Sequence, residues 1–82
     1  MTAQAITFSR WRHGGWYTSV RHNSGASGCV SRNYPDGKWR IVCDRRREGV
    51  TELGQPGDFT YPSRTAAAEA ERDLIAAGGG YD

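Results

Sequence analysis

The sequence predicts an α+β fold in which a three- to four-stranded antiparallel sheet, a β-meander, packs on one C-terminal α-helix. Two observations predict it: alternating apolar and polar segments separated by turn residues come first, and one unbroken helical segment follows. We expect a single domain over residues 1–82, with the sheet over about 5–54, the helix over about 64–77 and a frayed tail over 78–82. A chain of 82 residues has a thin core, which leaves little room for a deep substrate pocket.

The first two expected strands show the period of two that is typical of a half-buried strand. Residues 6–11 alternate in this way, and so do residues 16–21. In the second segment Trp16, Thr18 and Val20 share one face. We expect that face to lie under the helix, and the side chains between these three to point away from it.

Two further strands are expected on either side of a turn at residues 35–37, over residues 29–34 and 38–43. A loop rich in Asn, Ser and Gly precedes them at residues 22–28. Residues 50–53 are a further candidate for a short edge strand.

The C-terminal helix has clear signals at both ends. Pro62 prevents continuation from upstream, and Ser63 is a favourable N-cap residue. Residues 64–77 contain neither Gly nor Pro and are rich in Ala, and Gly78 follows at the position where a left-handed residue ends a helix. The expected buried stripe, at spacings of three and four, consists of Ala67, Ala70, Leu74 and Ala77.

The turn at residues 35–37 predicts a register for its hairpin. Pro35 suits the first central position of a type I turn, and Gly37 suits the left-handed position that follows. The loop would be closed by Tyr34 and Lys38; the competing two-residue loop would pair Pro35, which has no N–H, with Lys38. The expected helix-side pairs are then Asn33 with Trp39, Ser31 with Ile41, and Cys29 with Cys43.

The same register turns the other side chains of the hairpin outward, with Val30 opposite Val42 and Arg32 opposite Arg40. Two like charges in that arrangement destabilise a sheet unless an anion lies beside them. Either Glu52 of this chain or an external partner supplies that anion. The resulting basic sheet face is expected to contain Tyr17, Arg21, Arg32, Tyr34, Lys38 and Arg40.

Charge is distributed unevenly along the chain. Residues 1–47 carry nine basic and two acidic residues (9 − 2 = +7), whereas residues 48–82 carry two basic and seven acidic ones (2 − 7 = −5). Ten of the eleven basic residues are Arg, whose planar fork suits phosphate and carboxylate groups. The run Arg45, Arg46 and Arg47 adds a basic segment beside the sheet, either simply solvated or available to phosphate.

No residue pattern indicates an enzyme, a cofactor or a small-molecule substrate. Paired carboxylates, a nucleophile motif and a phosphate-binding loop are all missing from the sequence. Cys29 and Cys43 would be two buried thiols or a cross-strand disulfide, and thiols are favoured by the reducing cytoplasm that we expect. Zinc would require these cysteines with His13 and His22, but the four are too widely spaced for a typical site. No apolar run is long enough for a membrane helix, and residues 1–5 do not resemble a signal peptide.

The order of segments resembles a known family of DNA-binding domains. Residues 16–21, the hairpin over 29–44, Phe59, and the helix entry at 63–67 are similar to the three-stranded-sheet-plus-helix domains of the AP2 and integrase N-terminal type. The resemblance extends over about residues 16–77, and implies that outward strand residues contact DNA, which here are Arg21, Arg32 and Arg40. The size and composition also resemble small accessory proteins of phages and plasmids, such as anti-CRISPR proteins, which dock on a host protein.

Two hypotheses for function follow. The first is a non-enzymatic module that binds nucleic acid through the basic sheet face and residues 45–47, with Tyr17 and Tyr34 stacking on bases. The second is a protein-interaction module or inhibitor that docks on an acidic or nucleic-acid-binding host protein. Trp11, Trp16 and Trp39 are expected to pack in the core and the sheet under either hypothesis.

Overall fold

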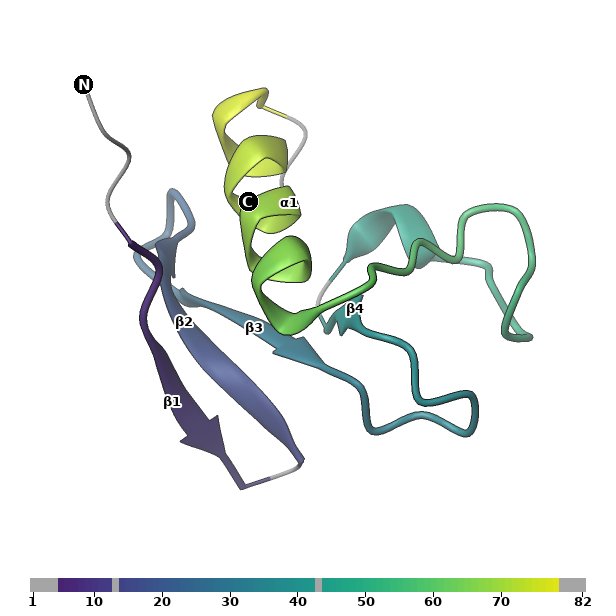
Figure 1. Cartoon of the computed structure of the whole chain (residues 1–82). Helices are drawn as coiled ribbons and strands as arrows, with labels where there is room; N and C mark the ends of the chain where they lie inside the picture. Colours follow the sequence, from purple (N-terminus) through teal and green to yellow (C-terminus); the bar gives the residue numbers. More distant parts are fainter. Residues whose placement is uncertain (1–4, 13, 43, 79–82) are drawn as a thin grey trace.

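The computed structural model of the chain describes residues 5–12, 14–42 and 44–78. It is a four-stranded antiparallel sheet with the strand order β1-β2-β3-β4, packed against one C-terminal helix (Figure 1). This confirms the predicted α+β class. The elements are β1 (Phe8–Trp11), β2 (Gly15–Arg21), β3 (Ser27–Ser31), β4 (Arg40–Ile41), the 3₁₀ helix η1 (Arg45–Arg47) and α1 (Arg64–Ala76).

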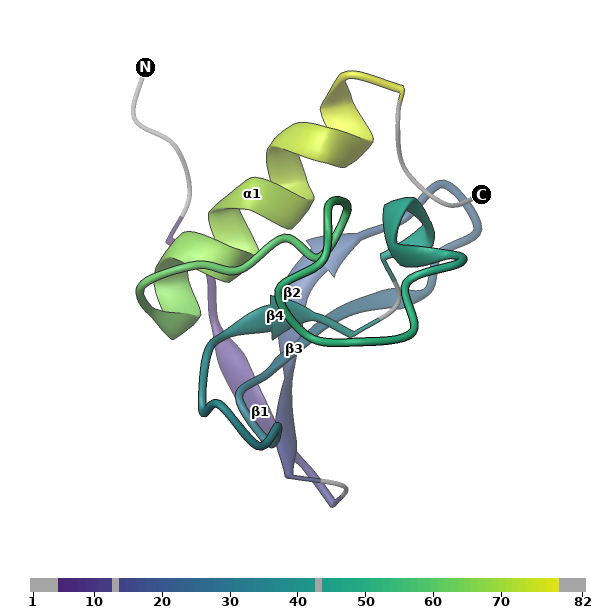
Figure 2. The ribbon, with the colours of Figure 1, turned by 90° about the vertical axis from the view of Figure 1, so that its right-hand side faces the viewer.

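Each strand pairs with the next one along the chain, so the sheet is a simple meander. Helix α1 lies across one face and contacts β2, β3 and β4. The segment between η1 and α1 returns past β4, as the turned view shows (Figure 2), and Tyr61 forms an isolated bridge with Trp39. The β1–β2 hairpin extends beyond the start of the helix, and this part of the helix-side face carries no second layer (Figure 1).

The core lies between the sheet and the first half of the helix. Val30, Ile41 and Ala67 are completely buried and form its centre. Complete burial of a Val or Ile side chain stabilises the fold by roughly 1.5–3 kcal/mol. Six partly buried hydrophobic residues, four of them aromatic, pack against this centre: Phe8, Trp16, Trp39, Tyr61, Ala70 and Leu74.

Strand β2 has the faces that its alternation predicts. Thr18 is 4% exposed and Val20 is buried on the helix side, where Trp16 packs against the core. Tyr17, on the other face, is 40% exposed, and Arg21 is also exposed. The period of two is sufficient here because one face of β2 meets the helix and the other meets solvent.

Helix α1 begins and ends within one residue of the predicted bounds. The Oγ of Ser63 accepts a hydrogen bond of 3.0 Å from the N–H of Ala66, as an N-cap residue should. Gly78 adopts a left-handed conformation, with φ of 75°, and donates its N–H to the carbonyl of Ile75.

The buried stripe of α1 differs in part from the expected one. Ala67, Ala70 and Leu74 do contact the core, but Ala77 is exposed because it lies beyond the last turn. Ala68 and Glu71 are buried instead, which rotates the covered face of the helix toward β2 and β3. A buried Glu at this position was not expected, since an isolated carboxylate in a core is unfavourable.

The strands around the second turn are shorter than predicted, and residues 50–53 do not form a strand. That segment is a series of turns in which the side-chain oxygen of Gln55 accepts the N–H groups of Thr51 and Glu52, at 2.9 and 3.2 Å. These local hydrogen bonds replace the ladder that an edge strand would have made.

The predicted hairpin register is wrong by one residue, although the turn itself is correct. Gly37 has φ of 68° and donates its N–H to the Tyr34 carbonyl at 2.9 Å, as the expected turn requires. The strands nevertheless pair Val30 with Ile41. The shift occurs because the chain leaves the ladder early, where the Oγ of Ser31 accepts the N–H of Asn33. It places two aliphatic side chains opposite each other in the core.

A one-residue shift exchanges the two faces of a strand. Val30, expected to point outward, is therefore on the helix side, and Ser31 is on the far face opposite Arg40. Trp39 remains on the helix side, where it packs against the core, and the guanidinium of Arg32 lies 5.7 Å from its ring centroid. The expected pair of Arg32 and Arg40 does not form.

Candidate functional site

Arg40 is the most strongly bound cation in the described structure, and it is 0% exposed. Its Nε and Nη2 donate to the two carboxylate oxygens of Asp58, both at 2.8 Å. Its Nη1 and Nη2 donate to the two oxygens of Asp36, both at 2.7 Å. Arg40 is therefore unavailable to a partner, and the expectation that it lies on a binding face is wrong. The neutralising carboxylates belong to this chain, but neither of them is Glu52.

These hydrogen bonds also determine the protonation of the cluster. The Arg40 guanidinium holds the pKa of Asp58 and that of Asp36 well below the usual carboxyl range. The N–H of Lys38 contributes for Asp36, and that of Gly54 contributes for Asp58. The two carboxylates in turn raise the pKa of Arg40, Asp58 more than Asp36. All three groups stay charged at neutral pH, so the cluster is a permanent electrostatic link between β4 and residues 36 and 58.

Tyr34 belongs to the same cluster and is only partly exposed. Its ring centroid lies 4.7 Å from the guanidinium carbon of Arg40 and 5.6 Å from that of Arg47. Arg47 is bound as well, because its Nε lies 3.1 Å from an oxygen of Asp58. Tyr34 and Arg47 therefore stabilise the folded chain. The sequence predicted both side chains on an exposed binding surface, whereas both are partly buried in this cluster.

The rest of the basic run is mostly paired. Asp44 caps η1 by accepting the N–H of Arg46, and its two carboxylate oxygens accept Nε and Nη2 of the same side chain at 3.0 and 2.7 Å. This pairing raises the pKa of Arg46. Arg46 also donates to the hydroxyl of Tyr61 and lies over the ring of Phe59. Within the described ranges Arg45 is exposed and has no ion pair with a carboxylate.

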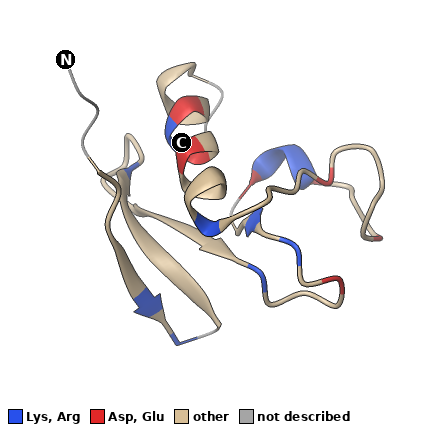
Figure 3. Ribbon diagram, in the orientation of Figure 1, with Lys and Arg blue, Asp and Glu red and all other residues tan. Residues whose placement is uncertain are grey.

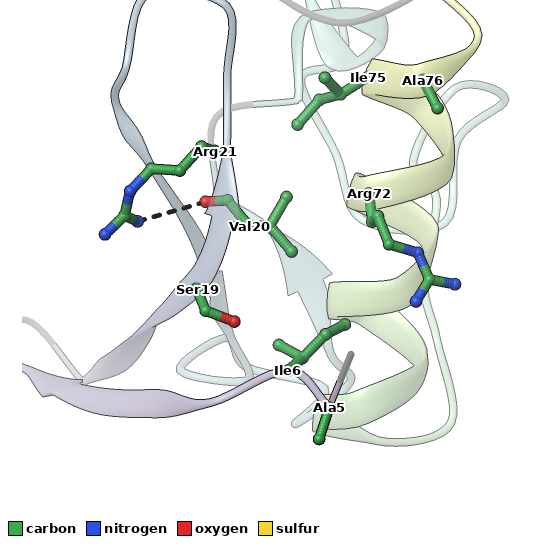
Figure 4. A pocket seen from close by; sticks show the side chains of 8 residues that line it. All are labelled: Ala5, Ile6, Ser19, Val20, Arg21, Arg72, Ile75 and Ala76. Atoms are coloured by element: carbon green, nitrogen blue, oxygen red, sulfur yellow. Dashed lines mark hydrogen bonds between the residues drawn. The ribbon is translucent and has the colours of Figure 1, made fainter. Parts of the chain in front are cut away.

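Two more of the expected site residues lie on the face away from the helix. The exposed ring of Tyr17 has its centroid 6.2 Å from that of Trp11. The guanidinium of Arg21 donates to the carbonyl of Thr18 at 3.1 Å and to that of Val20 at 3.4 Å, and Figure 4 shows the second of these hydrogen bonds. The nine expected site residues are thus divided between two faces of the sheet and an internal cluster.

The helix-side face beyond the start of α1 carries a second group of basic and aromatic side chains. The guanidinium carbon of Arg10 lies 5.1 Å from the ring centroid of Trp16, and that of Arg64 lies 4.6 Å from the same ring. Arg64 also lies over Phe8 at 4.0 Å. Basic positions at the end of β1, the start of α1 and the loop before β4 are visible in Figure 3. We define the basic aromatic face as Arg10, Arg32, Lys38 and Arg64 together with Trp16 and Trp39.

The parts of this face are held together by the core. Trp16 and Trp39 both pack against the cluster of Val30, Ile41 and Ala67, and Ala67 lies one turn after Arg64. In the part of the chain that the structure describes, the four cations of the face make no ion pair with a carboxylate. Positive charge therefore remains uncompensated where aromatic rings are also partly accessible.

Arg32 and Lys38 were expected as binding residues, but on the sheet face away from the helix. Arg10, Arg64 and the two tryptophans were not expected to belong to a binding site. A signal for Arg10 did exist, because the alternation of residues 6–11 places it on the same side as Phe8. A signal for Arg64 did not, because its position follows from how the helix start packs on the β1–β2 hairpin.

A different hollow, of about 290 Å³, lies at the other end of the sheet (Figure 4). Ile6, Val20 and Ile75 line it between the chain before β1, the end of β2 and the last turn of α1. In Figure 4 the charged ends of Arg21 and Arg72 point away from it. Its lining is chiefly apolar, and it offers no group suited to chemistry.

The cysteine and zinc predictions fall partly outside the described residues, which do not include His13 and Cys43. Cys29 is buried, and His22 is buried with its Nε2 3.0 Å from an oxygen of Glu71. Among residues 5–12, 14–42 and 44–78, no group of three or more His, Cys, Asp or Glu side chains is placed to hold a metal ion.

Comparison with known proteins places the chain in no family. No protein-family model matches it, and no curated protein or solved structure does so. The resemblance to AP2 and integrase N-terminal domains, and to phage and plasmid accessory proteins, therefore stays a prediction. The helix that the structure describes is too short and too polar to cross a membrane.

Proposed function

We propose that this protein is a non-enzymatic module that binds nucleic acid through the basic aromatic face. The single observation that carries the proposal is the combination on one surface of four cations without carboxylate partners and two partly exposed tryptophans. Phosphate groups are the anions that such a surface attracts over an extended area. The cytoplasmic location expected from the sequence is part of this proposal.

The contrast between paired and unpaired cations supports the choice of surface. Three arginines form ion pairs inside the protein. Asp36 and Asp58 pair with Arg40, Asp44 pairs with Arg46, and Asp58 also pairs with Arg47. Arg10, Arg32, Lys38 and Arg64, in contrast, have no carboxylate partner among the described residues. Uncompensated charge of one sign raises the local concentration of an anionic partner.

Arginine over an aromatic ring is also suited to a polyanion. A guanidinium stacked on Trp16 or Trp39 keeps its edge N–H groups free to donate to phosphate oxygens, while the ring holds its plane. Three of the four cations of the face are arranged in this way. The orientation of the donors is thus established before a ligand arrives, which reduces the entropy that binding would cost.

The test is a salt titration of binding to fluorescently labelled DNA, in single-stranded and duplex form. For a single strand that contacts about four cations, the slope of log K against log salt concentration should be about −3. The double variant Arg10→Gln and Arg64→Gln should reduce the size of this slope by about 1.4. Circular dichroism on the same samples establishes that each variant is folded.

Arg21→Gln is the matched control for the single variants Arg10→Gln and Arg64→Gln, because it removes one positive charge from the other face of β2. It should leave the slope and the affinity close to those of the unaltered protein. Equal losses in Arg21→Gln and Arg10→Gln would contradict the placement of the interface. Binding that ignores salt would contradict the proposed function itself, and capture of a host protein that survives nuclease treatment would favour the protein-interaction alternative.

A further inference from the structure

A hollow of about 450 Å³ opens within the basic aromatic face, between the loop before β4 and the segment that leads into α1. Its volume lies in the range of about 300–1,000 Å³ in which proteins bind small ligands. Arg32 and Lys38 supply positive charge at its rim, and Trp39 and Tyr61 supply aromatic surface. Gly37, Thr60 and Pro62 complete the lining.

The two sides of this hollow are joined by the backbone. Tyr61 donates its N–H to the carbonyl of Trp39 at 2.9 Å, and this bridge sets the spacing of the two segments. The Tyr61 hydroxyl accepts a hydrogen bond of 3.1 Å from Arg46, which is itself held by Asp44. The aromatic wall is therefore oriented by partners outside the hollow, as a preformed binding site requires.

The two cations at the rim of the hollow differ from Arg46, which is paired with Asp44. The guanidinium of Arg32 lies over the Trp39 ring, and Lys38 is exposed; in the described chain neither has a carboxylate partner. The nearby carboxylate of Asp36 is occupied by Arg40 and by the N–H of Lys38. A single anionic group between Arg32 and Lys38 would meet two donors and no competing acid.

We propose that this hollow is a subsite for one nucleotide unit of a single strand, with its phosphate between Arg32 and Lys38 and its base against Trp39. The inference rests on the proposed function and makes it more specific. An unpaired base is required, because the flat face of a base inside a duplex is already covered by its neighbours. The protein should therefore prefer single-stranded to duplex nucleic acid.

The experiment compares binding of a labelled oligothymidylate with binding of a hairpin duplex of equal charge, by fluorescence anisotropy at a series of salt concentrations. We expect the single strand to bind about tenfold more tightly, which corresponds to one stacked base. Trp39→Leu should weaken single-strand binding more than duplex binding, and so remove most of this preference. Lys38→Gln should weaken single-strand binding and reduce the size of its salt slope by about 0.7.

Because Trp39 packs partly against the core, Trp39→Leu is first checked for folding by urea denaturation. If Trp39→Leu is unfolded, Lys38→Gln provides the test, because Lys38 is exposed. Arg21→Gln, on the opposite face, should retain the preference. Equal affinity for the two forms, with a normal salt slope, would overturn this subsite but not the proposed function. Salt-independent or absent binding to both forms would overturn both.

Discussion

The guanidinium of Arg40 and the carboxylate of Asp58 face each other with two parallel hydrogen bonds of 2.8 Å, and both side chains are inaccessible to solvent. Asp58 lies in a connection without regular secondary structure, so this pair attaches that connection to β4. Such an arrangement has consequences for stability that can be measured separately from binding.

Replacing Arg40 should be among the most damaging single substitutions in the chain. Arg40→Met would leave the buried carboxylate of Asp58 without its main partner, at a cost of about 3 kcal/mol or more in the free energy of unfolding. Urea denaturation followed by circular dichroism measures this difference. Arg32→Met is the matched control, because Arg32 is exposed, and we expect it to change the same quantity by about 0.5 kcal/mol or less. Equal stability of the two variants would contradict the role given to Arg40.

Stability should fall in acid because of the same cluster. Arg40 lowers the pKa of Asp36 and of Asp58 in the folded state, whereas the unfolded chain has ordinary values of about 3.9. The contribution is therefore complete above the unfolded pKa, and is lost as the pH falls through and below about 4 toward the folded values.

Urea denaturation at a series of pH values from about 7 to about 2 should show this decrease, and it should be smaller in Arg40→Met. That variant lacks the guanidinium that lowers the two pKa values, so it serves as the control. The same slope in both proteins would assign the acid sensitivity to other carboxyl groups.

His22 and Glu71 should be energetically coupled, although they are far apart in the sequence. Their side chains approach to 3.0 Å between Nε2 and Oε2, and both are buried, Glu71 at 1% exposure. In a double-mutant cycle with His22→Ala and Glu71→Ala, we expect a coupling energy of about 1 kcal/mol or more. The exposed Glu69, on the same helix, provides the control cycle, whose effects should be additive within about 0.5 kcal/mol. Additivity in the first cycle would show that the contact adds nothing to stability.

Gly28 should not tolerate a side chain, for reasons of space alone. A Cβ at this position would collide with the carboxylate of Glu71 and the hydroxyl of Thr18. We expect Gly28→Ala to reduce the free energy of unfolding by about 1–3 kcal/mol, as measured by urea denaturation. Adding Glu71→Ala removes one of the colliding groups, so the double variant should lose less than the sum of the two single losses. A simple sum would mean that the collision is relieved in some other way.

Local sequence signals predicted the elements of this fold well. The helix follows from Ser63, the Ala-rich run and Gly78, and the inner face of β2 follows from the alternation of Trp16, Thr18 and Val20. The turn at Gly37 was also predicted correctly. Each of these features depends on interactions between residues that are close in the sequence, so the chain itself contains the information.

The basic aromatic face, in contrast, could not be predicted from those signals. A one-residue difference in register decided that Val30 enters the core and that Arg40 does not lie opposite Arg32. That difference depends on hydrogen bonds of Ser31 and on carboxylates as distant as Asp58. The competing registers share the same turn, so the contacts of the complete fold distinguish them.

The sequence by itself thus determined the class of fold, the helix, the strands of the first hairpin and an excess of positive charge in the first half of the chain. Only the tertiary structure decided which cations are neutralised inside the protein and which cations, among the described residues, have no carboxylate partner. The physical reason is that the sequence fixes how many charged residues each part of the chain carries. Whether a given cation is neutralised depends instead on which carboxylates the fold brings within hydrogen-bonding distance of it.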